Sequence, residues 1–411
     1  MNRAARFVLT FIFLLAAVGC VAPPKKIAAI VSVYNHNSHA DAIVGRLIET
    51  HTLDGKGARP NLQLVSLYTD QVPPDDKSRR LAARHGVAIH TNVADTLTLG
   101  TGRLAVDGIF FVIEHGNYPV NDLGATIYPK RRLFEEIAKV FRASGRAVPV
   151  FVDKALADNW RDVKWLHDTA RELNAPLMAG SSLPGLWRKP AADVRRGAKL
   201  KEIVAVSYHT LDHYGFHALE MIQCLAERRA NGETGVRAVQ CLVGDAVWVA
   251  GEQGMYDKEL LAAAWSRLKP KPSTKKPLRE LVKEPVLWSI EYTDGLRTTI
   301  LTLNGAVTEW AAAWREADGR SDSTLFWTQE ARPLGHFTFL VEGVERMMHT
   351  GRPSWPAERT LMTSGLLDAL LTSKKQRGER IETPHLQFSY RSGWDWQPPP
   401  PPPPARPFTE R

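Results

Sequence analysis

The chain has 411 residues, of which 44% are hydrophobic and 24% are charged. This length and composition can bury one large core or two medium ones, and they exclude a fibrous or wholly disordered protein. The formal net charge is +9, but no long basic run or RNA-binding signature accompanies it, so nucleic acid is not an expected partner.

The first 20 residues have the features of an export signal. Arg3 and Arg6 precede the apolar stretch "FVLTFIFLLAAV", which is too short to span a membrane comfortably. Small residues then precede Cys20 in "LAAVGC", which is similar to a bacterial lipoprotein cleavage site. We therefore expect an exported protein, either a periplasm-facing lipoprotein of the cell envelope or a secreted chain. Its only expected membrane contact is a lipid on Cys20.

Residues 25–182 alternate between apolar strand-like runs and amphipathic helical runs. Ser38 and Asp41 form a capping-box-like start to the first helix, which is expected to reach about Thr50. Gly86 and Gly145 end two later helices. The fourth strand is apolar on both faces, which is typical of a parallel sheet covered on both sides, and the alternation of strands and helices predicts such an open sheet. The expected strands are 27–34, 62–68, 87–90, 106–113, 148–153 and 176–182.

The pattern changes in residues 183–390. Runs rich in Val, Thr, Tyr and Trp with short turns predict an α+β domain with a large, mostly antiparallel open sheet. Residues 397–411 contain a run of prolines that favours a polyproline helix, and we expect a disordered extension. In the second domain, helices are expected at 215–230, 339–351 and 358–376, and strands at 201–210, 236–244, 285–293, 296–305 and 323–331.

Two cysteines, Cys224 and Cys241, follow the export signal. Cys224 lies in a helical pattern and Cys241 in a strand-like one. Two cysteines do not make a disulfide framework. We therefore expect both to behave as small buried apolar residues.

Three histidines recur at a spacing of four, namely His209, His213 and His217. On one continuous helix they would share a face, as metal ligands do. Gly215 and the strand-like run before His209 indicate that the helix begins after His209. The sequence therefore predicts no metal site.

Four stretches together resemble the Gfo/Idh/MocA family of oxidoreductases. "VFVDKALADNWRDVKWLHDTARELNAPLMAG" is similar to the family's EKP segment, and "DHYGFHALEMI" is similar to its DxGxHxxD helix. Residues 66–97 and 339–381 resemble its second strand–helix–strand unit and its closing helices. The resemblance implies an α/β fold, with an N-terminal Rossmann-like domain that binds NAD or NADP. A C-terminal α/β domain would hold a sugar or polyol and mediate a possible homo-oligomer.

The resemblance also implies catalytic residues. Lys154 matches the family lysine near the nicotinamide and the substrate hydroxyl, and His217 matches its acid/base histidine. His213 stands where the family has an aspartate, and the neighbouring Asp212 can supply that carboxylate. A surface lysine and a hydrogen-bonded structural histidine are the plainer alternatives for Lys154 and His217.

The cofactor-binding positions depart from the family. Its three turn glycines fall on Ser32, Tyr34 and Asn37, and the ring of Tyr34 stands where the backbone would approach the pyrophosphate. The capped helix start remains an anion site. Asp70 is the nearest candidate for the carboxylate that holds the ribose, and Glu114 begins the loop at the nicotinamide end.

The substrate contacts that we expect lie in two loops. His115, Asn117 and Tyr118 carry hydrogen-bonding groups after a buried strand, and Trp187 can stack on a sugar ring or pack at the domain seam. The expected function is oxidation or reduction of a sugar or polyol with a nicotinamide cofactor. The alternatives are a non-redox protein that binds a carbohydrate or metabolite, and a lyase or glycosidase without a cofactor.

Overall fold

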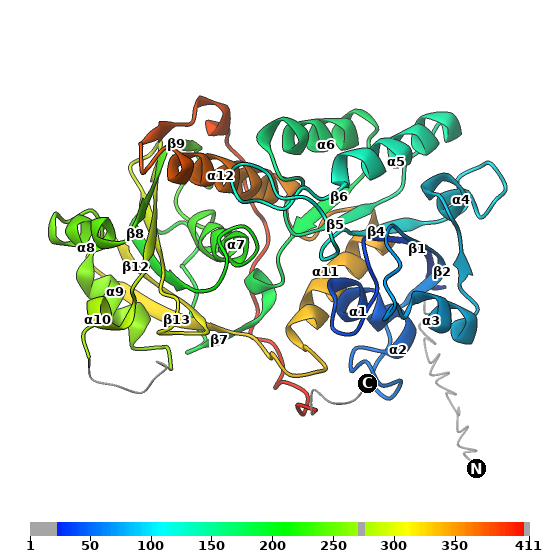
Figure 1. Cartoon of the computed structure of the whole chain (residues 1–411), viewed down its shortest axis with the longest axis horizontal. Coiled ribbons are helices and arrows are strands. Elements are labelled where there is room, and N and C mark those ends of the chain that lie inside the picture. The colour runs from blue at the N-terminus through cyan, green and yellow to red at the C-terminus, as the bar shows by residue number, and fades with distance from the viewer. Residues whose placement is uncertain (1–22, 270–275, 407–411) are drawn as a thin grey trace, which may run out of the picture.

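The computed structural model describes residues 23–269 and 276–406 (Figure 1). The predicted export signal, including Cys20, lies outside the described residues, so export and lipidation stay predictions. None of the helices in the described ranges is both long and apolar enough to cross a membrane.

Six parallel strands form the first sheet in the order β3-β2-β1-β4-β5-β6. Alternate residues of β1 enter different cores: Ile27, Ala29 and Val31 pack on one face, and Ala28 and Ile30 pack on the other. This double burial explains the continuous apolar runs and confirms the predicted parallel sheet. The strands are β1 Lys25–Val31, β2 Leu62–Thr69, β3 Ala88–Ile89, β4 Gly108–Val112, β5 Val150–Asp153 and β6 Leu177–Gly180.

Local signals in the sequence set the helix ends of this domain. The Ser38 hydroxyl accepts a hydrogen bond from the Asp41 amide, as the capping box predicts. Gly86 and Gly145 end α3 and α5 in the left-handed conformation. The expected first helix is divided at Val44 into two short helices. The helices are α1 His39–Ile43, α2 Gly45–Glu49, α3 Ser78–His85, α4 Val93–Thr98, α5 Lys130–Ser144 and α6 Trp160–Glu172.

Eight strands form the second sheet in the order β14-β9-β10-β11-β8-β12-β13-β7. Every pair is antiparallel except β8 with β11, so the mostly antiparallel prediction is confirmed. The strands are β7 Trp187–Lys189, β8 Leu200–Ser207, β9 Val236–Val243, β10 Val286–Tyr292, β11 Arg297–Thr302, β12 Trp310–Glu316, β13 Ser321–Trp327 and β14 Ile381–Glu382.

Helices cover both faces of the second sheet. Helices α7 and α12 lie between the two sheets, whereas α8, α9 and α10 lie on the far side (Figure 1). Cys224 and Cys241 are buried free thiols, as predicted, and burial raises the pKa of each to about 12. The helices are α7 Tyr214–Ala226, α8 Asp245–Glu252, α9 Lys258–Trp265, α10 Leu278–Leu281 and α12 Ala357–Lys375.

The last two long helices do not both pack in the second domain, to which the sequence assigned them. Helix α11, His336–Thr350, packs on the first sheet, where Val341 and Val344 share a core with Ile27. The chain then returns to the second domain through α12. Residues 183–390 therefore contribute to both cores rather than to one.

The Pro-rich tail is docked along the seam between the domains as far as it is described. Trp187 Nε1 donates to the Pro400 carbonyl at 2.6 Å, and Gln329 Nε2 donates to the Pro403 carbonyl at 2.6 Å. The Arg406 amide donates to the Arg332 carbonyl. Residues 397–406 therefore differ from the predicted disordered extension, because proline carbonyls serve as acceptors for side chains of the folded domains.

Candidate functional site: a histidine pocket between the domains

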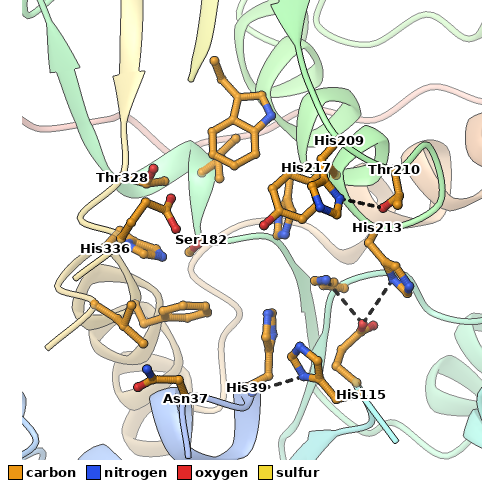
Figure 2. Close-up of a pocket in the computed structure, with 18 of the residues that line it drawn as sticks. Asn37, His39, His115, Ser182, His209, Thr210, His213, His217, Thr328 and His336 are labelled. Atoms are coloured by element: carbon orange, nitrogen blue, oxygen red, sulfur yellow. Dashed lines mark hydrogen bonds and ion pairs between the residues drawn. The ribbon is translucent and has the colours of Figure 1, made fainter. Parts of the chain in front are cut away.

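A cavity of about 400 Å³ opens between the two domains, at the carboxyl edge of the first sheet. The start of α1, the residues after β4 and β5, and the starts of α7, β12 and α11 all contribute to its wall. Ligands collect at this edge in open α/β sheets. We call it the histidine pocket after six residues that line it: His39, His115, His209, His213, His217 and His336 (Figure 2).

Lys154 lies in the histidine pocket, directly after β5. Its Nζ is 3.3 Å from one carboxylate oxygen of Glu114, and Lys130 Nζ donates to the other oxygen at 3.3 Å. Burial alone would raise the pKa of Glu114, but Lys154 and Lys130 outweigh it and hold that pKa at about 2. Glu114 therefore stays ionised and positions the ammonium group of Lys154 in the cavity.

His217 reaches the pocket from the first turn of α7. Its Nδ1 is 2.5 Å from the Ser181 hydroxyl, at the end of β6. Burial, and then the charge of Lys154, lower the pKa of His217 well below its usual value. The ring is therefore neutral at neutral pH, and it can accept a proton through Nε2 when the Ser181 bond holds the proton on Nδ1. Lys154 and His217, which are far apart in sequence, thus share one cavity.

His213 and Asp212 precede α7. His213 Nε2 is 3.2 Å from an Asp212 oxygen, and its Nδ1 is 3.9 Å from Glu114. Asp212 itself lies beside the histidine pocket, in a smaller adjoining cavity, and accepts a hydrogen bond from Thr126. Asp212 therefore contacts His213 rather than the pocket.

His39 and Asp153 form a contact that the sequence did not reveal. His39 Nδ1 lies 2.6 Å from Asp153 Oδ2, across 114 positions of sequence. Neither His39 nor Ser181 is among the site residues that the sequence predicts. The capping box could have indicated that His39 faces the sheet edge, but no sequence signal links it to β5.

Aromatic rings form another wall of the pocket. Tyr214 and Trp310 stack with ring centroids 5.6 Å apart and an angle of 17°, and His209 stacks on Tyr214 at 4.3 Å. Tyr128 and Phe337 line the same cavity. Such rings can pack against the apolar face of a sugar or cyclic polyol, whose hydroxyls would face the polar wall.

The turn after β1 is filled by the chain's own groups. Tyr34 is fully buried where the family's second glycine would be. The Asp41 carboxylate accepts hydrogen bonds from the Asn37 amide at 2.9 Å, from Lys77 Nζ at 2.6 Å and from Arg332 at 2.8 Å. A dinucleotide places its diphosphate at this helix start. Here the Asp41 carboxylate already holds Lys77 and Arg332, the two cations that could bind a diphosphate.

The predicted ribose position is also occupied. Asp70 accepts hydrogen bonds from Tyr68, Tyr118 and Arg132 at 2.8, 2.9 and 2.6 Å. Gln71 and Asn117 exchange two hydrogen bonds of 2.9 Å, which join the loop after β2 to the loop after β4. Because β1 lies between β2 and β4, this contact crosses the place where a dinucleotide would pass, and it would have to open for one to bind.

The other predicted site residues have varied surroundings. Ser32 is buried and donates to the Glu114 carbonyl, whereas Asn37 and His115 line the histidine pocket. Asn117 and Tyr118 lie outside the residues that line it. Trp187 packs against Trp327 and Phe339 at the seam and bonds the tail, so its surroundings match its packing alternative. Among the described residues, no three His, Cys, Asp or Glu side chains could together hold a metal ion.

Comparisons with known proteins identify the fold. No family model matches the chain, and no curated protein matches it in sequence. Among solved structures, GenD2 from gentamicin A biosynthesis, in complex with NAD, matches with a TM-score of 0.56 and 13% identity, covering 88% of this chain and 97% of that one. The scyllo-inositol dehydrogenase from Lactobacillus casei, with NAD(H) and scyllo-inositol bound, matches with a TM-score of 0.52 and 11% identity, covering 87% and 99%.

These matches span both domains, from the parallel sheet to the large antiparallel one. At such identities they establish the arrangement of elements and leave the chemistry to the site. The chain therefore has the two-domain fold expected from its resemblance to the Gfo/Idh/MocA dehydrogenases.

Proposed function

We propose that this protein is an oxidoreductase that acts on a sugar or polyol bound in the histidine pocket. The observation that carries the proposal is the position of Lys154, whose ammonium group enters the same cavity as the neutral ring of His217. An ammonium group can polarise the oxygen of a substrate hydroxyl or carbonyl, and a neutral imidazole can accept the proton of the hydroxyl.

Two further features support this substrate class. The aromatic wall of Tyr214 and Trp310 faces a wall of charged and polar groups, as a ring with hydroxyls requires. The fold neighbours include a scyllo-inositol dehydrogenase and a protein of gentamicin A biosynthesis in complex with NAD. A sugar or cyclic polyol therefore fits the cavity, and a cyclic polyol is the ligand of one neighbour.

The redox partner that the fold favours is NAD or NADP. For either dinucleotide to bind, the Gln71–Asn117 contact would have to open and the diphosphate would have to compete with Asp41. We therefore assign only binding and proton transfer to the described residues. Lys154 orients the oxygen of the reacting carbon, and a histidine of the pocket holds its proton.

The test begins with the purified chain before any ligand is added. Native mass spectrometry detects a nucleotide that has co-purified, and calorimetry then measures the binding of NAD(H) and NADP(H). Finally, a panel of inositols, hexoses and amino sugars is assayed for nicotinamide absorbance changes. Lys154→Met serves as the matched inactive variant, and the exposed Lys164→Met on α6 serves as its control.

The proposal is supported if a nucleotide co-purifies or binds with micromolar affinity, and if the chain turns over one of these substrates. The Lys154→Met variant should abolish that turnover. The absence of co-purified nucleotide, together with no binding at millimolar concentration, contradicts the proposal. Binding of a sugar without nucleotide would then assign a non-redox role to the histidine pocket.

A further inference from the structure

We propose that His39, aligned by Asp153, is a proton-accepting catalytic residue of the histidine pocket and a stronger base than His217. This inference rests on the proposed function, since it names the group that would take the substrate's proton. It assigns a role to a residue at the start of α1, on the opposite domain from α7.

The geometry of the pair supports this role. His39 Nδ1 and Asp153 Oδ2 are 2.6 Å apart, and the Asp153 side chain is only 1% exposed. A short hydrogen bond that one ring nitrogen donates to a buried carboxylate fixes the tautomer, and it leaves the other ring nitrogen free to accept a proton. Within the described residues, no hydrogen bond of His39 Nε2 to a protein group is found. His39 lines the pocket, so Nε2 is the atom available to a ligand.

The ring of His39 is also held in place by packing. It meets Phe337 edge-on, with centroids 5.1 Å apart. The ring of His115, beside it in Figure 2, has its centroid 5.1 Å away. The backbone amide of His39 points to His115 Nδ1 at 3.5 Å. A base that is held by a carboxylate on one side and by an aromatic ring on another needs little reorganisation when a substrate arrives.

The charges around the pair keep His39 unprotonated. Lys154 faces it from the residue after β5 and Lys130 faces it from α5, and His115 and Glu114 face it from the loop after β4. Burial, and then Lys154, lower the pKa of His39 well below its usual value, while burial and Glu114 raise the pKa of Asp153 to about 7. His39 is therefore neutral at neutral pH, and above the pKa of Asp153 that side chain is the carboxylate that accepts the Nδ1 proton.

His217 has a weaker partner. Its Nδ1 contacts a serine hydroxyl, Ser181, rather than a carboxylate. A carboxylate stabilises the imidazolium that forms when a proton is accepted, and a neutral hydroxyl stabilises it much less. For this reason we rank His39 above His217 as the base, although His217 is the histidine that the family resemblance indicates.

The first experiment needs no substrate. The full chain is treated with diethyl pyrocarbonate, and the acylation rate of each histidine is followed by peptide mass spectrometry. We expect Asp153→Asn to slow His39 roughly tenfold or more, because the amide can hold the wrong tautomer. Asp122→Asn, in an exposed loop, should leave that rate unchanged. An equal His39 rate in Asp153→Asn and the unmodified chain, or no acylation of His39 at all, would overturn the proposal.

A second measurement keeps the test valid if Asp153→Asn fails to fold. In the ¹⁵N spectrum of the unmodified protein at about pH 8, above the pKa of Asp153, His39 should show an unprotonated Nε2 and a protonated Nδ1. A protonated Nε2 would contradict the proposal without any variant.

A third measurement uses a substrate found with the panel above. His39→Gln should lower kcat by roughly 100-fold or more with KM nearly unchanged, and should lose more than His217→Gln. The opposite ranking overturns the proposal. If no member of the panel is turned over, the proposed function fails, whereas the acylation rates and the tautomer of His39 still decide whether it is an aligned base.

Discussion

The two ends of the crevice at the carboxyl edge of the first sheet differ in how their polar groups are used. At one end, which we call the turn end because it includes the turn after β1, the carboxylates of Asp41 and Asp70 each accept hydrogen bonds from several groups of the chain itself. At the other end, which we call the pocket end, the side chains of Lys154, His39 and His217 each contact one polar partner and face the histidine pocket. The first end stabilises the fold, whereas the second is arranged for a ligand.

This difference shows that the fold alone does not determine whether a dinucleotide binds. A parallel sheet with a capped first helix is compatible with a dinucleotide, but the side chains at the turn decide whether one enters. Here the turn end has become a packed and charge-neutralised region. The pocket end keeps a cation and histidine side chains that face a cavity.

The largest expected effect concerns stability at the turn end. Asp41→Ala removes a fully buried carboxylate and leaves Lys77 and Arg332 without their shared partner. Breaking such a buried network costs about 3–5 kcal/mol in the free energy of unfolding. Urea unfolding measures it, with the exposed Asp122→Ala as the control. A loss below about 1 kcal/mol would mean that the turn end is not stabilised by these charges.

The opposite pattern is expected for Lys154→Met. Glu114 keeps Lys130 as a partner, so the free energy of unfolding should fall by less than it does for Asp41→Ala. Turnover should fall by about 10²–10⁴-fold, because the pocket loses its cation. Parallel unfolding and kinetic assays compare the two losses. A large destabilisation with little kinetic change would assign Lys154 a structural role instead.

A smaller effect is expected from pH. Burial, followed by Arg46 and His39, lowers the pKa of His336 to about 3 in the folded state. The unfolded chain therefore binds this proton more readily, and the stability that neutral His336 contributes is complete above pH 6.5 and declines below it by up to about 1.4 kcal/mol per pH unit. Unfolding at pH 7, 6 and 5 should show a shallower decline for His336→Gln.

The raised pKa of Asp153 makes stability rise as the pH falls, which opposes the effect of His336. Because Asp153 is present in both proteins, the difference between their slopes reports His336. The exposed His85→Gln, at the end of α3, should retain the slope of the unmodified chain. Identical slopes for His336→Gln and the unmodified chain would contradict the prediction.

The smallest expected effect comes from Gln71→Ala. It removes two hydrogen bonds that join the loops after β2 and β4, at a cost of about 1 kcal/mol or less. Calorimetry should show tighter binding of NAD(H), because the path over β1 opens. Gln63→Ala, exposed on β2, is the matched control. Unchanged nucleotide affinity would mean that Asp41 and Tyr34 alone close the turn end.

Much of this fold could be predicted from the sequence because the signals are local. The capping residues Ser38, Gly86 and Gly145 act within one turn of their helices, and apolar periodicity fixes most strands. Strand β12 was missed because its Ala-rich run lacks β-branched residues. The position of α11 was missed because amphipathicity does not say which sheet a helix covers.

The site was predictable only in part, and for the same reason. Family resemblance indicated Lys154 and His217, and the structure brings both to one cavity. The His39–Asp153 pair joins two segments that are far apart in sequence, and no sequence pattern links the two residues. Likewise, no sequence pattern shows that the cations around Asp41 are already taken.

The docked tail has a consequence for how the molecule moves. The chain crosses between the two domains at 181–186, 328–335 and 351–356, and residues 397–406 make a fourth connection that ends near the loop after α2. A hinge opening would have to bend all four connections together. The four connections therefore oppose a hinge opening between the domains, and we expect a ligand to reach the cavity through local displacements of the surrounding loops.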